Sequence, residues 1–136
     1  MPHTTLSHTA DTGIEATAPT LIGLVEELAT GMFELMAPVD PCPGDEEVTA
    51  TVEASTIDDL VLDSLAELLY LAEAEDLHLC RFEVEPQGES ILRIRAVGLP
   101  TADAEPTGPP IKAVTYHQFE VSPSDEGWYA RVYFDV

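Results

Sequence analysis

The stretch IKAVTYHQFEVSPSDEGWYARVYFDV, residues 111–136, holds two runs in which apolar and polar side chains alternate. Alternation with a period of two is typical of β-strands that bury one face, because successive side chains point to opposite sides. The SPSDEG segment between the runs is rich in turn-forming residues. The stretch therefore predicts an antiparallel hairpin with strands at 111–121 and 128–136.

The apolar faces of this hairpin align when Val121 lies opposite Trp128. In that register Lys112 lies diagonal to Asp135, at a distance that a long lysine side chain can cover. The alternation puts His117 on the apolar face, so we expect a core-side histidine with a hydrogen-bonded ring nitrogen. A catalytic pair of Lys112 and His117 is disfavoured, because the two residues point to opposite faces.

Two amphipathic helices are predicted upstream of the hairpin. Apolar residues recur at three- and four-residue spacing from Leu21 to Met36, and Thr20 is a suitable N-cap for that helix. The second helix begins after Thr56, which has the spacing of a capping box with Asp59, and it reaches about Glu75. Each helix carries an apolar face, so both are expected to pack against a sheet.

Further alternating segments and a surface loop complete the pattern. The loop is PTADAEPTGPP, residues 100–110, where proline and polar residues exclude regular structure. Two helices and about six strands without regular βαβ alternation predict an α+β fold. We expect a single two-layer domain over residues 1–136, with an antiparallel or mixed sheet and both helices on one face. The further strands are predicted at 14–18, 47–54, 77–85 and 91–98.

The chain is strongly acidic, with 26 Asp and Glu residues against 5 Lys and Arg residues and a formal net charge of −21. Such a surface repels nucleic acid and anionic lipid, so direct binding to either is not expected. The composition is typical of a protein adapted to a salty cytoplasm, and a very acidic mesophilic protein is an equal alternative. No signal peptide or stretch of about 20 apolar residues is visible, which predicts a cytoplasmic protein.

The two cysteines, Cys42 and Cys80, are expected to be free thiols. They lack the C-x-x-C spacing of a zinc site, and two cysteines do not make a disulfide-rich framework. Structural zinc and a stabilising disulfide are therefore both disfavoured.

The five basic residues all fall on the polar faces of predicted strands. One interpretation is a positive patch on the open face of the sheet that attracts a specific partner. The other, which the pattern favours, is that each arginine offsets a glutamate on the neighbouring strand. The five residues are Arg81, Arg93, Arg95, Lys112 and Arg131.

Two aspartates from opposite ends of the sequence are candidate metal ligands. Asp11 closes the segment HTAD, and Asp135 precedes Val136 in the segment YFDV. The Asp135 side chain and the α-carboxyl of Val136 are oxygen ligands of the kind that hard cations prefer, and Asp11 completes the site if the first strand reaches the last. Taken alone, lone aspartates are more often helix caps or solvated residues. Common enzyme signatures such as G-x-S-x-G and H-E-x-x-H are absent.

Four segments, taken together and in order, resemble the archease family over residues 6–136. They are HTAD at 8–11, ELLYL at 67–71, IKAVTYH at 111–117 and WYARVYFDV at 128–136. The resemblance implies an accessory protein of an RtcB-type RNA ligase, which joins the RNA ends left by tRNA splicing. Members of the family promote guanylylation of the ligase's catalytic histidine and support repeated turnover, and they do not themselves join RNA.

The resemblance also implies a site. A divalent cation, with calcium as the expected ion, is held by Asp11, Asp135 and Val136, and Lys112 is a functional lysine beside it. The loop before IKAVTYH departs from the family, whose members often carry an acidic, histidine-bearing segment where this chain has DAEPTGPP. A ligase contact by that loop is therefore not carried over to this chain.

Two functions from other classes remain open. One is a chaperone-like or purely structural acidic module, which needs no metal and tolerates loss of Lys112. The other is a small enzyme that uses Lys112 and Tyr116, which needs a concave pocket and a shifted lysine pKa.

Overall fold

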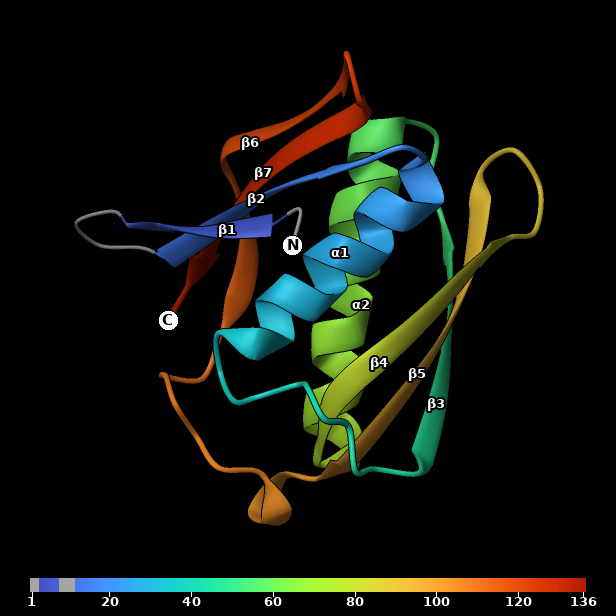
Figure 1. Ribbon diagram of the computed structural model, residues 1–136. Helices are drawn as coiled ribbons and strands as arrows, with labels where there is room; N and C mark the ends of the chain where they lie inside the picture. The colour runs from blue at the N-terminus through green and yellow to red at the C-terminus, as the bar shows by residue number, and fades with distance from the viewer. Residues whose placement is uncertain (1–2, 8–11) are drawn as a thin grey trace.

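Two antiparallel sheets and two helices form the structure, a computed structural model that describes residues 3–7 and 12–136 (Figure 1). The helices are α1 (Leu21–Glu34) and α2 (Ile57–Glu75), and a short 3-10 turn, η1, covers Thr101–Asp103. The predicted α+β class is confirmed. The strands are β1 (His3–Ser7), β2 (Thr12–Ala18), β3 (Glu46–Glu53), β4 (Leu77–Pro86), β5 (Ile91–Pro100), β6 (Ala113–Ser124) and β7 (Gly127–Asp135).

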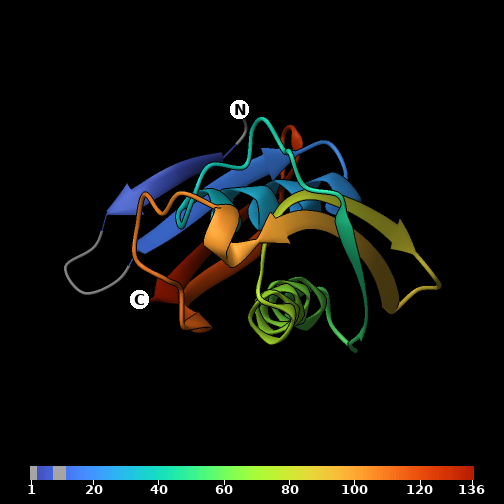
Figure 2. The same ribbon diagram turned by 90° about the horizontal axis from the view of Figure 1, so that it is seen from below.

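The strands are divided between two sheets rather than joined in the single sheet expected from the sequence. One sheet has the order β1-β2-β7-β6 and the other the order β3-β5-β4. Both helices bridge the two sheets, because α1 contacts β2 and β4 while α2 contacts β6 and β3 (Figures 1 and 2). Alternation identifies the buried face of a strand but not its neighbours, so the division was not visible in the sequence.

The core receives side chains from both sheets and both helices. Ile14, Leu28, Leu65, Ile94 and Phe134 are each 0% exposed. Each buried side chain of this size contributes about 1.5–3 kcal/mol to stability. The predicted apolar faces of helices and strands therefore meet in one continuous core.

Both helices begin at the N-caps predicted from the sequence. The Thr20 hydroxyl accepts a hydrogen bond from the Gly23 N–H at 3.0 Å, and the Thr56 hydroxyl accepts one from the Asp59 N–H at 3.1 Å. Helix α2 is followed by the C-cap residue Asp76, whose φ of 56° is left-handed, a common way to stop a helix. Among the described residues, no helix combines the length and the apolar character needed to cross a membrane.

The β6–β7 hairpin has a tighter turn than the sequence predicted. Its turn consists of residues 125–126, with Ser124 opposite Gly127. Val121 consequently lies opposite Ala130, and the predicted register that pairs it with Trp128 is wrong. The prediction treated all of SPSDEG as the turn, whereas part of that segment continues the ladder of strand hydrogen bonds.

A bulge interrupts β6 between Thr115 and Glu120. Residues 116–119 stand against Val132 alone, and within them Gln118 has a left-handed φ of 52°. The Arg131 Nε donates to the Gln118 carbonyl at 2.9 Å, which fastens the bulge to β7. His117 is exposed, so the prediction that it faces the core is wrong, because the bulge breaks the alternation on which that prediction depended.

Cys42 and Cys80 form a disulfide, with their Cα atoms 5.7 Å apart. The prediction of free thiols is therefore wrong. The disulfide joins the loop after α1 to β4 and links two cysteines that are 38 positions apart in the sequence. Such a long-range contact has no spacing signature, so sequence inspection could not detect it.

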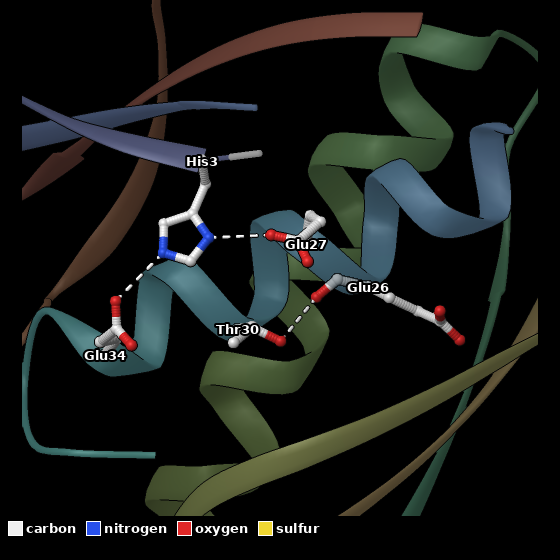
Figure 3. A network of polar contacts seen from close by, with 5 residues as sticks. All are labelled: His3, Glu26, Glu27, Thr30 and Glu34. Atoms are coloured by element: carbon white, nitrogen blue, oxygen red, sulfur yellow. Dashed lines mark hydrogen bonds and ion pairs between the residues drawn. The ribbon is translucent and has the colours of Figure 1, made fainter. Parts of the chain in front are cut away.

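A histidine fastens the edge strand β1 to helix α1 (Figure 3). His3 Nδ1 lies 2.9 Å from Glu27 Oε2, its Nε2 lies 3.1 Å from Glu34 Oε1, and the His3 side chain is only 6% exposed. Burial alone would lower the pKa of His3, but the hydrogen bonds and charges of the two glutamates outweigh burial and raise that pKa. The arrangement therefore favours the protonated ring, in which both nitrogens donate.

Candidate functional site

Lys112 and Asp135 meet at the end of the four-stranded sheet where β6 begins and β7 ends. The Lys112 N–H donates to the Asp135 carbonyl at 2.8 Å, and Ala113 is the register partner of Asp135. Both Lys112 and Asp135 are exposed. A main-chain bond therefore joins the two residues and leaves their charged side chains on the surface.

The first residue of β2 reaches the same end of the sheet. Thr12 is the register partner of Phe134, so β2 starts beside the last residues of β7. Asp11 immediately precedes Thr12 in the sequence and lies outside the described residues. Within the described ranges, no group of three or more His, Cys, Asp or Glu residues is placed to hold a metal ion.

The donors at this sheet end have the chemistry of a hard-cation site. Asp135 offers carboxylate oxygens, and its neighbour Val136 is 40% exposed. Oxygen donors suit calcium or magnesium, whereas the sulfurs that a softer metal prefers are joined in the disulfide. The described residues thus fit part of the expected ligand set, and the third expected ligand, Asp11, lies outside the described residues.

Tyr116 contacts helix α2. Its hydroxyl donates to Asp59 Oδ1 at 3.1 Å, and its side chain is 65% exposed. The hydrogen bond to Asp59 raises the pKa of Tyr116, with smaller contributions from desolvation and the negative charges of Asp59 and Asp63. The raised pKa keeps the Tyr116 hydroxyl protonated, as its donation to Asp59 requires.

The loop between β5 and β6 carries Lys112 and is tied to the residues that follow α1. The Met36 carbonyl accepts hydrogen bonds from the N–H groups of Thr107 at 3.0 Å and Gly108 at 3.4 Å. The Ile111 N–H donates to the Met36 sulfur at 3.4 Å. Lys112 is therefore positioned from two sides, by the Met36 contacts and by the strand partner Asp135.

His78 holds the segment after α1 against β4. Its side chain is buried, and its Nε2 lies 3.1 Å from the Ala37 carbonyl and 3.2 Å from the Pro38 carbonyl. Burial lowers the pKa of His78, and the two carbonyl contacts only partly oppose this effect. Sequence reasoning missed His78, whose only signal was a polar residue inside an otherwise apolar run.

The arginines are distributed over two sheets and do not form the single positive patch considered from the sequence. Arg95 Nη2 lies 2.7 Å from Glu83 Oε1, and these residues are register partners on β5 and β4. The register partners Arg131 and Glu120 approach to 3.6 Å on the other sheet. The cross-strand interpretation is confirmed for these arginines, which leaves Lys112 as the basic residue at the candidate site.

The chain matches one protein family and several of its members over nearly its full length. Residues 3–136 match the model of the Archease protein family (MTH1598/TM1083). Protein archease of Methanosarcina mazei is 32% identical over 136 residues, covering 96% of this chain and 93% of that protein. Protein archease of Methanopyrus kandleri is 32% identical over 140 residues, with 100% of each chain covered.

Solved structures show the same architecture. The solution structure of Methanobacterium thermoautotrophicum protein 1598 has a TM-score of 0.81 at 26% identity and covers 99% of each chain. The crystal structure of an archease from Thermotoga maritima, described as a possible chaperone, has a TM-score of 0.69 at 21% identity. It covers 96% of this chain and 94% of that chain, so the likeness in fold extends over both molecules.

Proposed function

Because the chain belongs to the archease family, we propose that it is an accessory protein of an RtcB-type RNA ligase in tRNA splicing. In this proposal it promotes guanylylation of the ligase's catalytic histidine and allows repeated turnover, without joining RNA itself. The observation that carries the proposal is the meeting of Lys112 and Asp135 at one sheet end. Lys112 belongs to IKAVTYH, the segment that most strongly resembles the family, and Asp135 belongs to another of the four resembling segments.

Lys112 is proposed to act as a positive point charge toward a phosphate or a ligase carboxylate. It is the only lysine of a chain with a net charge of −21, and its side chain is exposed. An ammonium group on a flexible stem can rotate its three donors toward such an oxygen. The main-chain bond to Asp135 and the contacts of Met36 with the preceding loop fix the position from which the side chain extends.

A divalent cation, with calcium as the expected ion, is proposed to bind beside this lysine. Asp11, the carboxylate of Asp135 and an oxygen of Val136 are the proposed ligands. When bound, the ion supplies positive charge that attracts phosphate oxygens in an otherwise acidic surface. The protein's own part is to join the main chains of Lys112 and Asp135, so that the lysine and the proposed ion lie at the same end of the sheet.

A single-turnover guanylylation assay tests the function. The cognate ligase is mixed with labelled GTP and manganese, alone and with this protein, and the rate of label transfer to the ligase is measured. Wild-type protein is expected to accelerate the transfer. Absence of acceleration by folded wild-type protein would contradict the proposed function.

The role of Lys112 is tested in the same assay. Lys112→Ala is expected to return the rate to that of the ligase alone, and Lys112→Arg is expected to restore little, because a planar guanidinium does not replace a compact ammonium. The free energy of unfolding of Lys112→Ala should differ from that of wild type by no more than about 0.5 kcal/mol, since Lys112 is exposed. Arg81→Ala, which removes an exposed positive charge from the other sheet, is the matched control and should behave as wild type.

A chaperone-like role is the second candidate, because the Thermotoga maritima structure carries the description of a possible chaperone. In that case the protein should suppress aggregation of unrelated unfolded proteins, and Lys112→Ala should retain the effect. Loss of ligase stimulation on Lys112→Ala, with no suppression of aggregation, favours the ligase function.

A further inference from the structure

A cavity of about 520 Å³ opens beside the candidate site, where the ends of α1 and α2 meet the loop that leads into β6. Its walls include Phe33, Met36, Leu69, Leu77 and Ile111, all of them apolar. The volume lies within the range of about 300–1,000 Å³ found for pockets that bury apolar ligand groups. The cavity can therefore accept one or more large apolar groups.

The rim of the cavity carries two acidic residues and one lysine. Glu73 and Asp76, at the end of α2, line it and are exposed, and Lys112 lines it from the loop. Tyr70 is 64% exposed and shares a helix face with Glu73 three residues later. Exposed aromatic side chains are enriched in protein interfaces, and acidic groups around an apolar pocket favour a basic, apolar partner segment.

The cavity is continuous with the candidate functional site through Lys112. The same residue lines the cavity and bonds through its main chain to Asp135. A segment seated in the cavity would therefore lie next to the lysine ammonium. Binding and activation can then occur on adjoining parts of one surface, with different residues responsible for each.

We propose that this cavity is the docking surface for the ligase, and that it receives a large apolar side chain from a basic segment of that partner. The inference rests on the proposed function and adds the place and the chemistry of the contact. A second copy of this chain, a nucleic acid or an anionic membrane would bring negative charge to a protein of net charge −21. A basic protein segment gains attraction from the same charge.

The proposal is tested by filling the cavity without deleting core side chains. Ala104 lines the cavity from the loop and is half-buried, so Ala104→Trp places a bulky ring where the partner side chain would lie. Binding of the variant to purified cognate ligase is measured by titration calorimetry. We expect an affinity at least about tenfold weaker than that of wild type, as for obstruction of an interface anchor. Ala104→Ser, which adds no bulk, is the matched control and should bind as wild type.

A second variant tests the rim and preserves the shape of the cavity. Glu73→Gln combined with Asp76→Asn removes two charges, and asparagine tolerates the left-handed conformation at position 76. The double variant should associate more slowly and show a weaker salt dependence. Glu46→Gln with Glu53→Gln, which changes the net charge equally on β3, should associate with the ligase as wild type does.

The outcomes separate the docking surface from the proposed function. Wild-type stimulation together with undiminished binding by Ala104→Trp, folded as judged by its melting temperature, would overturn the docking surface alone. If Ala104→Trp does not fold, a Glu73→Gln and Asp76→Asn double variant that associates with the ligase as wild type does would also overturn the docking surface. A wild-type protein that neither binds nor stimulates the ligase overturns both the function and the docking surface. Weak binding by both variants with normal binding by both controls supports the proposal.

Discussion

The main chain and the side chains of Lys112 and Asp135 have separate roles. The Lys112 N–H is bonded to the Asp135 carbonyl, which holds the ends of β6 and β7 together, while both charged side chains are exposed. A substitution of either side chain leaves that main-chain bond in place. Functional effects at this sheet end can therefore be measured in folded variants.

The proposed cation site gives a stability prediction for Asp135. An ion that binds only the folded protein stabilises it by about 2.7 kcal/mol at a concentration of about 100 times its Kd. Calcium should therefore raise the melting temperature of wild type, and Asp135→Asn or Asp11→Asn should abolish the increase. The measurement is a thermal melt with and without calcium at constant ionic strength.

The matched control for this melt is Asp125→Asn. Asp125 is exposed in the turn at the opposite end of the same hairpin, so its substitution removes the same charge far from the proposed site. It should retain the full response to calcium. Equal responses in wild type, Asp135→Asn and Asp125→Asn would point to general screening of negative charge and exclude the site.

Residue-level prediction succeeded where alternation was regular and failed where it was interrupted. The placement of Lys112 and Asp135 at one end of the sheet followed from the facing strands, but their predicted diagonal relation is wrong, because the true register pairs Ala113 with Asp135. His117 was misplaced because Gln118 adopts a left-handed conformation that no pattern of apolar residues reveals. The cavity walls were likewise not predictable, since they come from three segments far apart in the sequence.

At the level of elements, the stability provided by the contacts of His3 on β1 with helix α1 should depend on pH. The pKa of His3 is raised by Glu27 and Glu34 in spite of its burial. Its stabilisation is therefore fully present below the ordinary pKa of 6.5 and is lost as pH rises through the raised value. The difference in unfolding free energy between wild type and His3→Gln should be largest below pH 6.5 and should shrink as pH rises through the raised pKa of His3.

The comparison with His3→Gln is needed because His78 titrates with the opposite sign. Burial lowers the pKa of His78, so its contribution to stability is present above the ordinary pKa of 6.5 and is lost as pH falls. Wild type and His3→Gln both contain His78, so the effect of His78 cancels in the difference between their unfolding free energies. If the difference in unfolding free energy stays constant across the pH range, the contacts between β1 and α1 do not depend on protonated His3.

The disulfide should be a major source of stability for the segment after α1. It closes a loop with a sequence separation of 38 residues, for which restriction of the unfolded chain predicts about 2–4 kcal/mol. Cys42→Ser with Cys80→Ser should lower the free energy of unfolding by that amount in denaturant titrations. Reductant should destabilise wild type similarly and leave the double variant unchanged; equal stability of all samples would contradict a structural role.

The elements themselves were largely predictable, and their pairing was not. Thr20 and Thr56 marked the two helix starts correctly because a capping hydroxyl is a local requirement. Strand β1 was missed because HTTLS contains a single apolar residue and has no alternation. Pairing into two sheets and the contact of Cys42 with Cys80 depend on long-range packing, for which one sequence carries no direct signal.

For the whole molecule, the net charge of −21 predicts a strong dependence of stability on salt. Repulsion between surface carboxylates falls as dissolved ions reduce the Debye length from about 10 Å at 0.1 M to about 3 Å at 1 M. The melting temperature should rise steeply over that range if the charge is an adaptation to a salty cytoplasm. A melting temperature that does not change would reject this interpretation.

The salt response has an internal control in the kind of salt. Potassium chloride and sodium chloride at equal ionic strength screen charge equally, so both should produce the same increase. A response to sulfate alone would instead indicate strengthened burial of apolar surface.

The bulge in β6 also affects whether copies of the molecule can associate edge to edge through their sheets. β6 is an outer strand of the four-stranded sheet, and an outer strand presents unpaired N–H and C=O groups to which another chain can add. Residues 116–119 break this row, because they stand against Val132 alone and bend away from a flat ladder. Pro123, which lacks an N–H, interrupts the row again before the turn. The irregularity that misled sequence inspection thus protects a long edge strand from growing into a shared sheet.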